Sequence, residues 1–95
     1  MAYLSNPAQC GDYSVTLGGT NGTACAANTA RSFLMIQNTG TSSAVISFTN
    51  NTPVAGSAGC FVLGSGSAPL MFSPVVPNGP VYYSGTGGEL VILQG

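Results

Sequence analysis

Three side chains carry all the formal charge of this 95-residue sequence, and any acid–base chemistry would have to start from them: Asp12, Arg31 and Glu89. Two carboxylates that folding brings together can act as a general acid and a general base. However, a single cation in a chain of apolar and neutral polar residues needs an anion nearby, because an unpaired buried charge is costly. We therefore expect a structural ion pair between Arg31 and Glu89 or Asp12, and we favour it over catalysis by the two carboxylates.

Other catalytic and metal-binding arrangements lack the residues that they need. The chain has no His and no Lys, which removes Ser–His and Cys–His pairs, Schiff-base lysines and histidine metal sites. Cys10, Cys25 and Cys60 are too widely spaced for a zinc site, and their odd number argues against a disulfide framework, although Cys10 and Cys25 could pair. Neither glycine-rich stretch, 64–67 or 85–88, is followed by a Lys or a helix, so both are expected to be turns. The sequence predicts no enzyme, no cofactor and no metal.

The composition also limits the partners. With one basic residue, the chain lacks the charge that binds phosphate backbones or anionic membranes, so we expect neither nucleic acid nor membrane as a partner. A hydrophobic content of 44% with only 3% charged residues argues against a disordered chain. The first residues have no basic segment followed by an apolar stretch, so we expect no export by a signal peptide.

Short runs of alternating or continuous apolar residues are separated by Gly, Pro and Asn turn signals every eight to twelve residues or so. Gly and Pro interrupt every window that is long enough for a helix. The pattern predicts an all-β fold, an antiparallel, jelly-roll-like β-sandwich of about eight short strands. We expect residues 1–12 to form an N-terminal arm and 13–95 to form a single domain. The predicted strands are 13–17, 23–27, 32–38, 44–49, 60–63, 69–72, 81–84 and 89–94. We expect the third and fourth of these to form one hairpin and the last two to form another.

The central run, 32–38, is apolar on both of its faces. In a strand, Phe33 and Met35 point one way and Leu34 and Ile36 the other. A small domain has one core and can cover only one of these faces, so the other needs another sheet, a loop or another protein. Few charges remain to oppose self-association. We therefore expect the protein to work inside an assembly as a homo-oligomer. The interface residues that we expect are Tyr3, Leu4, Tyr82 and one face of the central run, with Phe33 and Met35 as the chosen pair.

Four stretches of the sequence resemble a known group of proteins. They are the segment ANTARSFLMIQN at 27–38, VISF at 45–48, PVYY at 80–83 and GELVILQG at 88–95. Their order resembles small all-β virion proteins of tailed bacteriophages, of the head decoration or cement type. The resemblance implies a β-sandwich, often a trimer, that sits on the major capsid protein in a virion assembled in the host cytoplasm. The resemblance identifies no catalytic residue in this sequence.

Other functions stay open at this stage. The protein could be a neck, tail or fibre-base component of the virion. It could also be a small carbohydrate-binding module that stacks Tyr82 or Tyr83 on a sugar ring. An ice-binding protein would need regular Thr-x-Thr spacing on a flat strand, which the sequence lacks.

Overall fold

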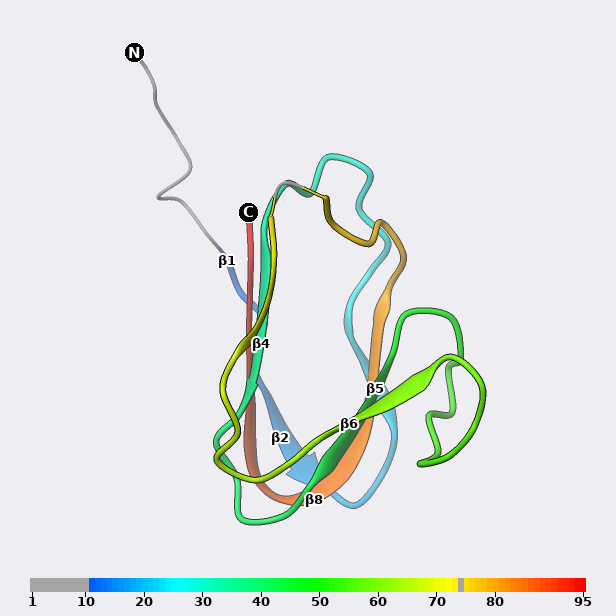
Figure 1. The fold of residues 1–95 in the computed structure, drawn as a ribbon, viewed down its shortest axis with the longest axis vertical. Helices are drawn as coiled ribbons and strands as arrows, with labels where there is room; N and C mark the ends of the chain where they lie inside the picture. Colours follow the sequence, from blue (N-terminus) through cyan, green and yellow to red (C-terminus); the bar gives the residue numbers. More distant parts are fainter. Residues whose placement is uncertain (1–10, 74) are drawn as a thin grey trace.

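The computed structural model describes residues 11–73 and 75–95, and these form an antiparallel sheet of eight strands that curls into a half-barrel (Figure 1). The all-β, antiparallel prediction is therefore confirmed, whereas a sandwich of two separate sheets is not shown. In chain order the strands are β1 (Gly11–Asp12), β2 (Val15–Gly18), β3 (Gly22–Cys25), β4 (Leu34–Asn38), β5 (Ala44–Ser47), β6 (Cys60–Leu63), β7 (Leu70–Phe72) and β8 (Val81–Gln94).

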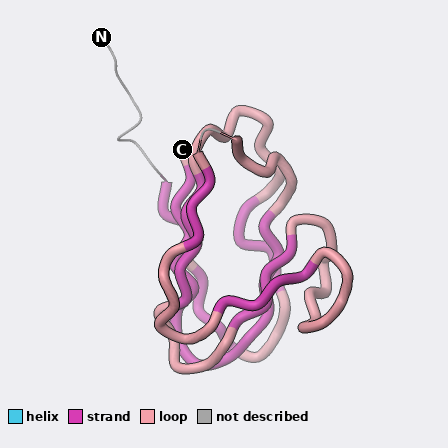
Figure 2. The backbone as a smooth tube through the Cα atoms, in the orientation of Figure 1, coloured by secondary structure: helices cyan, strands magenta, loops and turns pink. Residues whose placement is uncertain are grey.

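The long strand β8 organises the sheet, because every other strand pairs either with it or with one of its direct partners. Its first half pairs with β5 and β3, and its second half pairs with β4, β2 and β1. The strands β6 and β7 then lie at two edges, beyond β5 and β4 respectively. The sheet thus has two halves that share β8, and Figure 2 shows them as two groups of strands facing each other.

Both predicted hairpins are wrong, and glycine explains the second of them. The strands β4 and β5 do not pair with each other in the sheet, since each is hydrogen-bonded to a different half of β8. The run 85–88 is a bend within one continuous strand instead of a turn between two. Gly85, Gly87 and Gly88 have positive φ angles of 149°, 89° and 125°, which side-chain-bearing residues rarely adopt. A Cβ on Gly88 would lie 2.6 Å from the Cα of Gly40, so the loop after β4 crosses the bend in close backbone contact.

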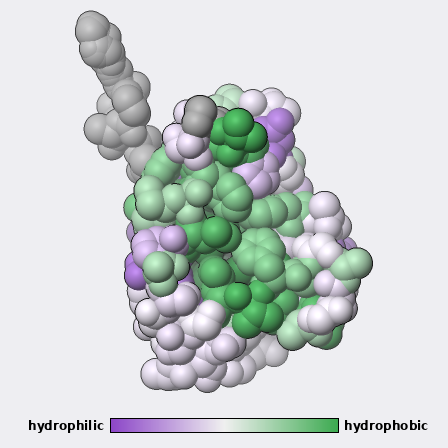
Figure 3. Space-filling view, in the orientation of Figure 1, coloured by the Kyte–Doolittle hydropathy of each residue, from purple (hydrophilic) through white to green (hydrophobic). Residues whose placement is uncertain are grey.

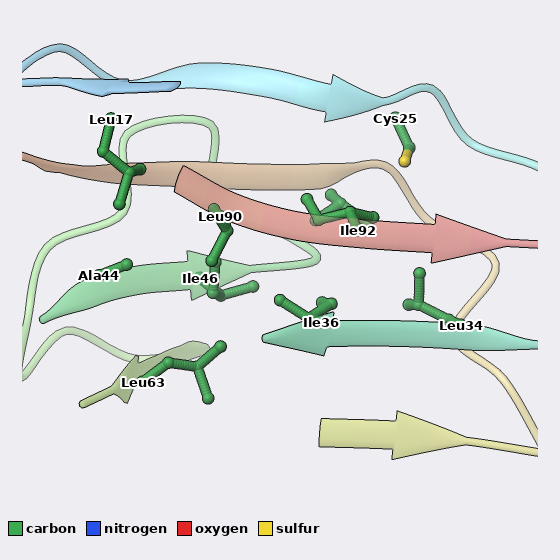
Figure 4. Close-up of a cluster of buried hydrophobic side chains, with 10 residues drawn as sticks. Leu17, Cys25, Leu34, Ile36, Ala44, Ile46, Leu63, Leu90 and Ile92 are labelled. Carbon is green, nitrogen blue, oxygen red and sulfur yellow. The ribbon is translucent and has the colours of Figure 1, made fainter. Parts of the chain in front are cut away.

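The core lies inside the curl of the sheet and contains ten buried apolar residues. Figure 4 shows their side chains converging from both halves of the sheet. The strand β4 contributes Leu34 and Ile36, so in the central run this pair faces the core, and Met35 faces outward. The ten residues are Leu17, Cys25, Leu34, Ile36, Ala44, Ile46, Leu63, Val81, Leu90 and Ile92.

A buried asparagine ties the loop between β4 and β5 to the sheet. The Asn38 side chain donates to the carbonyls of Ser42 (2.7 Å) and Leu63 (3.0 Å), and its oxygen accepts from the Gly40 N–H at 2.9 Å. Asn38 is fully buried, and these bonds offset the cost of removing its amide from water. The loop is therefore fixed at the position where the two halves of the sheet meet.

Candidate interaction surfaces

A row of apolar side chains crosses the outside of the second half of the sheet. Met35 is opposite Met71 of β7 on one side and opposite Leu93 of β8 on the other. Residues that are directly paired across strands point to the same face, and the neighbours Leu34 and Ile36 are in the core, so this row points outward. Met71 is 59% exposed, and Met35 and Leu93 are half-buried. We call Met35, Met71 and Leu93 the outer strip; at a strand spacing of about 4.8 Å it is about 10 Å wide.

A cluster of phenylalanines lies on the open side of the half-barrel, between the edge strands β6 and β7. The ring of Phe48 is 5.5 Å from that of Phe61 and 5.7 Å from that of Phe72. All three residues are half-buried and pack against the core. Figure 3 shows apolar side chains gathered over the middle of the molecule on the side where the two halves of the sheet open. Aromatic pairs at these distances attract one another, so the cluster helps to hold β6 and β7 together although their backbones do not pair.

The loop of residues 50–59 covers part of the outer face of the first half of the sheet, and Val62 of β6 on that face stays 50% exposed. The Ser84 hydroxyl on β8 donates to the Pro53 carbonyl at 3.0 Å, and the Ser47 hydroxyl on β5 donates to the Gly59 carbonyl at 2.9 Å. Pro53 is buried. Residues of this loop and of β8 line a shallow, open pocket of about 280 Å³. The Ser84 hydroxyl, which lines that pocket, is already occupied within the chain, and the pocket contains no charged group.

The predicted interface residues are not brought together as one group. Met35 is in the outer strip and Phe33 is half-buried just before β4, but Tyr82 lies in the other half of the sheet, opposite Ser47 and Thr23. Tyr3 and Leu4 lie outside the described residues. Met71 and Leu93 were not among the predicted interface residues. The sequence did hold a signal for Leu93, since residues 89–94 are apolar on both faces, as 32–38 are.

The guanidinium of Arg31 is bonded to neutral oxygens and not to the expected carboxylates. Arg31 is 5% exposed. Its Nε donates to the Gln94 side chain at 2.5 Å, Nη1 donates to the carbonyls of Pro77 (2.7 Å) and Gly79 (3.0 Å), and Nη2 donates to the carbonyl of Ala26 at 3.1 Å. Four hydrogen bonds from one side chain thus join the end of β8 to two loops. The guanidinium is solvated by backbone dipoles, which removes the need to bury a carboxylate beside it.

The two carboxylates are at the surface, each bonded to a neighbouring hydroxyl. Asp12 accepts hydrogen bonds from the Ser14 hydroxyl at 2.6 Å and from the Ser14 N–H at 3.0 Å, which lower the pKa of Asp12. Glu89 accepts from the Thr16 hydroxyl at 3.2 Å. No ion pair with Arg31 forms in the part of the chain that the structure describes, and both carboxylates stay in contact with water.

The structure describes two of the three thiols, and one of these, Cys25, is buried in the core. Burial raises the pKa of the Cys25 thiol, although the positive charge of Arg31 opposes the shift, so Cys25 is held as the neutral thiol at neutral pH. Cys25 and Cys60 are both free, and Cys10 lies outside the described residues. Residues 11–73 and 75–95 contain no cluster of three metal-binding side chains. The residues in these two ranges form no helix that could cross a bilayer.

Comparison with known families, with curated proteins and with solved structures gives no match for this sequence. The observations about function are therefore those of the molecule itself. These are an almost uncharged surface, an antiparallel sheet partly covered on one outer half, and an apolar strip on the other.

Proposed function

We propose that this chain is a non-enzymatic structural protein of a phage virion, a decoration or cement protein that binds the outer head surface and bridges neighbouring capsid subunits. The observation that carries the proposal is the outer strip, three apolar side chains on the outside of a small sheet whose core is already filled. The four stretches that resemble phage virion proteins supply the setting. In this proposal the two facing halves of the curled sheet correspond to the layers of a jelly-roll-like sandwich.

Such a bridge would be held by the burial of apolar surface, in a contact that is repeated many times around the shell. Covering apolar surface contributes about 25 cal/mol per Å². A single small contact is therefore weak, but the same contact repeated around a shell makes the assembly much harder to open. With three charged residues in the chain, little of this attachment depends on ion pairs, so salt would weaken it only slightly. The partners in this proposal are the major capsid protein and further copies of the chain, with a trimer as the favoured oligomer.

The test is mass spectrometry of purified phage particles, with the copy number of the protein measured relative to the major capsid protein. The proposal expects many copies, in a fixed ratio to the capsid subunits. A few copies per particle would replace it with a neck, tail or fibre-base role. Absence from particles would overturn the virion proposal altogether.

A variant pair asks whether the outer strip makes the attachment. Particles stripped of the protein are incubated with the wild-type chain, with Met71→Thr or with Val62→Thr. Val62 is the matched control, because it is 50% exposed on the other edge strand, β6, and lies outside the strip. We expect Met71→Thr to lower the occupancy of the particles and Val62→Thr to leave it unchanged. Equal occupancy for all three chains would remove the outer strip from the proposal.

A further inference from the structure

The outer strip lies next to the point where the first ten residues join the sheet. Asp12 of β1 is paired with Leu93, so it belongs to the same row as the strip, at the far end from Met71. Gly11 is paired with Gln94, the last residue of β8. Residues 1–10 therefore join the sheet beside the apolar row.

The sequence of this segment suits an apolar docking partner. It contains Tyr3 and Leu4, no Gly and no charged side chain. An extended segment of this length reaches about 33 Å, which is more than enough to cross a strip about 10 Å wide. A second globular domain suits the strip less well. The outside of a curled sheet is convex, so two such faces would touch over a small area, whereas stable interfaces bury about 1,200 Å² or more.

The direction of β1 favours a neighbouring copy over the same chain as the acceptor. Because β1 is antiparallel to β8 and Gly11 is opposite the last residue of β8, β1 enters the sheet at the end where β8 finishes. A segment that kept the direction of β1 would lead away from the strip of its own molecule, and covering that strip would require a reversal of the chain. A neighbouring molecule needs no reversal.

We infer that the outer strip is the docking site for residues 1–10 of a second copy of this chain, with Tyr3 and Leu4 as the apolar contacts. The contact is head-to-tail, because one molecule gives its segment and receives another on a different surface. Such a contact builds a ring of identical subunits where the rotation between copies closes, and a filament where it does not. The inference deepens the proposed function, because it assigns the outer strip to the contact between copies of the chain; mass spectrometry of particles tests the virion role, and the crosslinking below tests this contact.

The experiment uses the full-length chain with a photoreactive benzoylphenylalanine in place of Leu4. Chains labelled with ¹⁴N and ¹⁵N are mixed while unfolded, refolded together, irradiated and digested with trypsin. Arg31 is the only site for trypsin, so the digest separates the first segment, in peptide 1–31, from the whole strip, in peptide 32–95. Fragmentation of the crosslinked product then locates the acceptor within 32–95.

The inference expects crosslinks at Met35, Met71 or Leu93, with ¹⁴N–¹⁵N hybrids as abundant as same-isotope pairs. Same-isotope pairs alone would show that the segment covers its own strip, which overturns the second copy as occupant. Crosslinks elsewhere, or none between the two peptides, would overturn the strip as the docking site.

Self-association provides the second measurement, by sedimentation equilibrium of the unmodified full-length chain. Met71→Thr removes one apolar contact and is expected to weaken association about tenfold. The matched control, Val54→Thr, changes a residue that is 57% exposed but lies in the loop of residues 50–59. A wild-type chain that remains monomeric at every concentration, or variants that weaken association equally, would overturn the inference.

Discussion

The two halves of the sheet share one strand and one core, yet different groups lie on their outer faces. Outside the first half, the loop of residues 50–59 lies across the strands and is held by hydrogen bonds from Ser47 and Ser84. Outside the second half, Met35, Met71 and Leu93 form an apolar row, and Met71 is 59% exposed. On the first half, Ser47 and Ser84 offer hydroxyls that bond to a loop, whereas the outer strip on the second half consists of three apolar side chains that make no such bonds.

This difference concerns which outer face of the sheet the described residues cover. A small chain buries one face of its sheet in its own core and has limited material for the other. In this chain the loop of residues 50–59 lies over the half of the sheet that has Ser47 and Ser84 on its outer side. Outside the half with methionines, residues 11–73 and 75–95 leave Met71 59% exposed. Val54, Val62 and Val75 are exposed as well, but none of them is paired with a residue of the outer strip.

The bend that joins the two halves should be the most sensitive point of the fold. Gly88→Ala would place a Cβ 2.6 Å from the Cα of Gly40, on a backbone with φ of 125°. The close contact and the unfavourable φ together should lower the free energy of unfolding by about 4 kcal/mol. Urea unfolding of the full-length chain measures it.

A glycine in open space is the control for the bend. Nothing lies within 4 Å of a Cβ built on Gly64, and its φ is not positive, so Gly64→Ala should change stability little. Equal losses for Gly64→Ala and Gly88→Ala would mean that the bend is not where the halves are fixed to each other.

Substitutions on the two faces of β4 should also differ clearly in how much they lower the free energy of unfolding. Leu34 is fully buried and Met35 is half-buried in the outer strip. Leu34→Ala leaves a cavity in the core and should cost about 3 kcal/mol. Met35→Ala, measured at a concentration where the chain is monomeric, should cost less than about 1 kcal/mol. Chemical unfolding of the two variants decides this, and a loss at Met35 as large as that at Leu34 would show that the outer strip is already covered in the monomer.

Arg31 should matter as a hydrogen-bond donor more than as a charge. Arg31→Met keeps much of the side-chain volume but leaves the Gln94 side chain and the carbonyls of Ala26, Pro77 and Gly79 without their donor. We expect a loss of about 2 kcal/mol in the free energy of unfolding. Arg31→Lys keeps the charge without the planar array of donors. Full recovery of stability by Lys would contradict the hydrogen-bonding role.

Much of the fold followed from periodicity and turn signals, but the pairing of the strands did not. The predicted strand 60–63 agrees with β6, and 32–38 ends at the same residue as β4. The glycines at 85–88 mark a change of direction, and the sequence does not say whether the chain turns back or bends and continues. That outcome depends on the close contact between Gly88 and Gly40, which are far apart in sequence.

Part of the outer strip could likewise be predicted from the sequence, and part could not. Alternation placed Met35 on the face opposite to Leu34, and the double-sided run 89–94 pointed to a second such strand. Met71 became part of the strip only through the register of β7 with β4, which the sequence does not fix. The hydrogen-bond acceptors of Arg31 could not be predicted, for a different reason. Three of the four are backbone carbonyls, which every residue has and which leave no pattern in the sequence.

The smallest expected effect is a pH dependence at Asp12, at the edge of the half that carries the outer strip. The hydrogen bonds from Ser14 lower the pKa of Asp12 from its ordinary value, so the folded state holds the carboxylate more firmly than the unfolded chain does. The resulting stabilisation is fully present above the unfolded pKa and is lost as the pH falls through the lower, folded pKa. Unfolding midpoints in urea between pH 6 and pH 2, at constant salt, should therefore fall slightly at the acid end, and less so for Ser14→Ala. An identical acid profile for Ser14→Ala and the wild-type chain would show that the Ser14 hydroxyl does not stabilise the ionised Asp12 in the folded state.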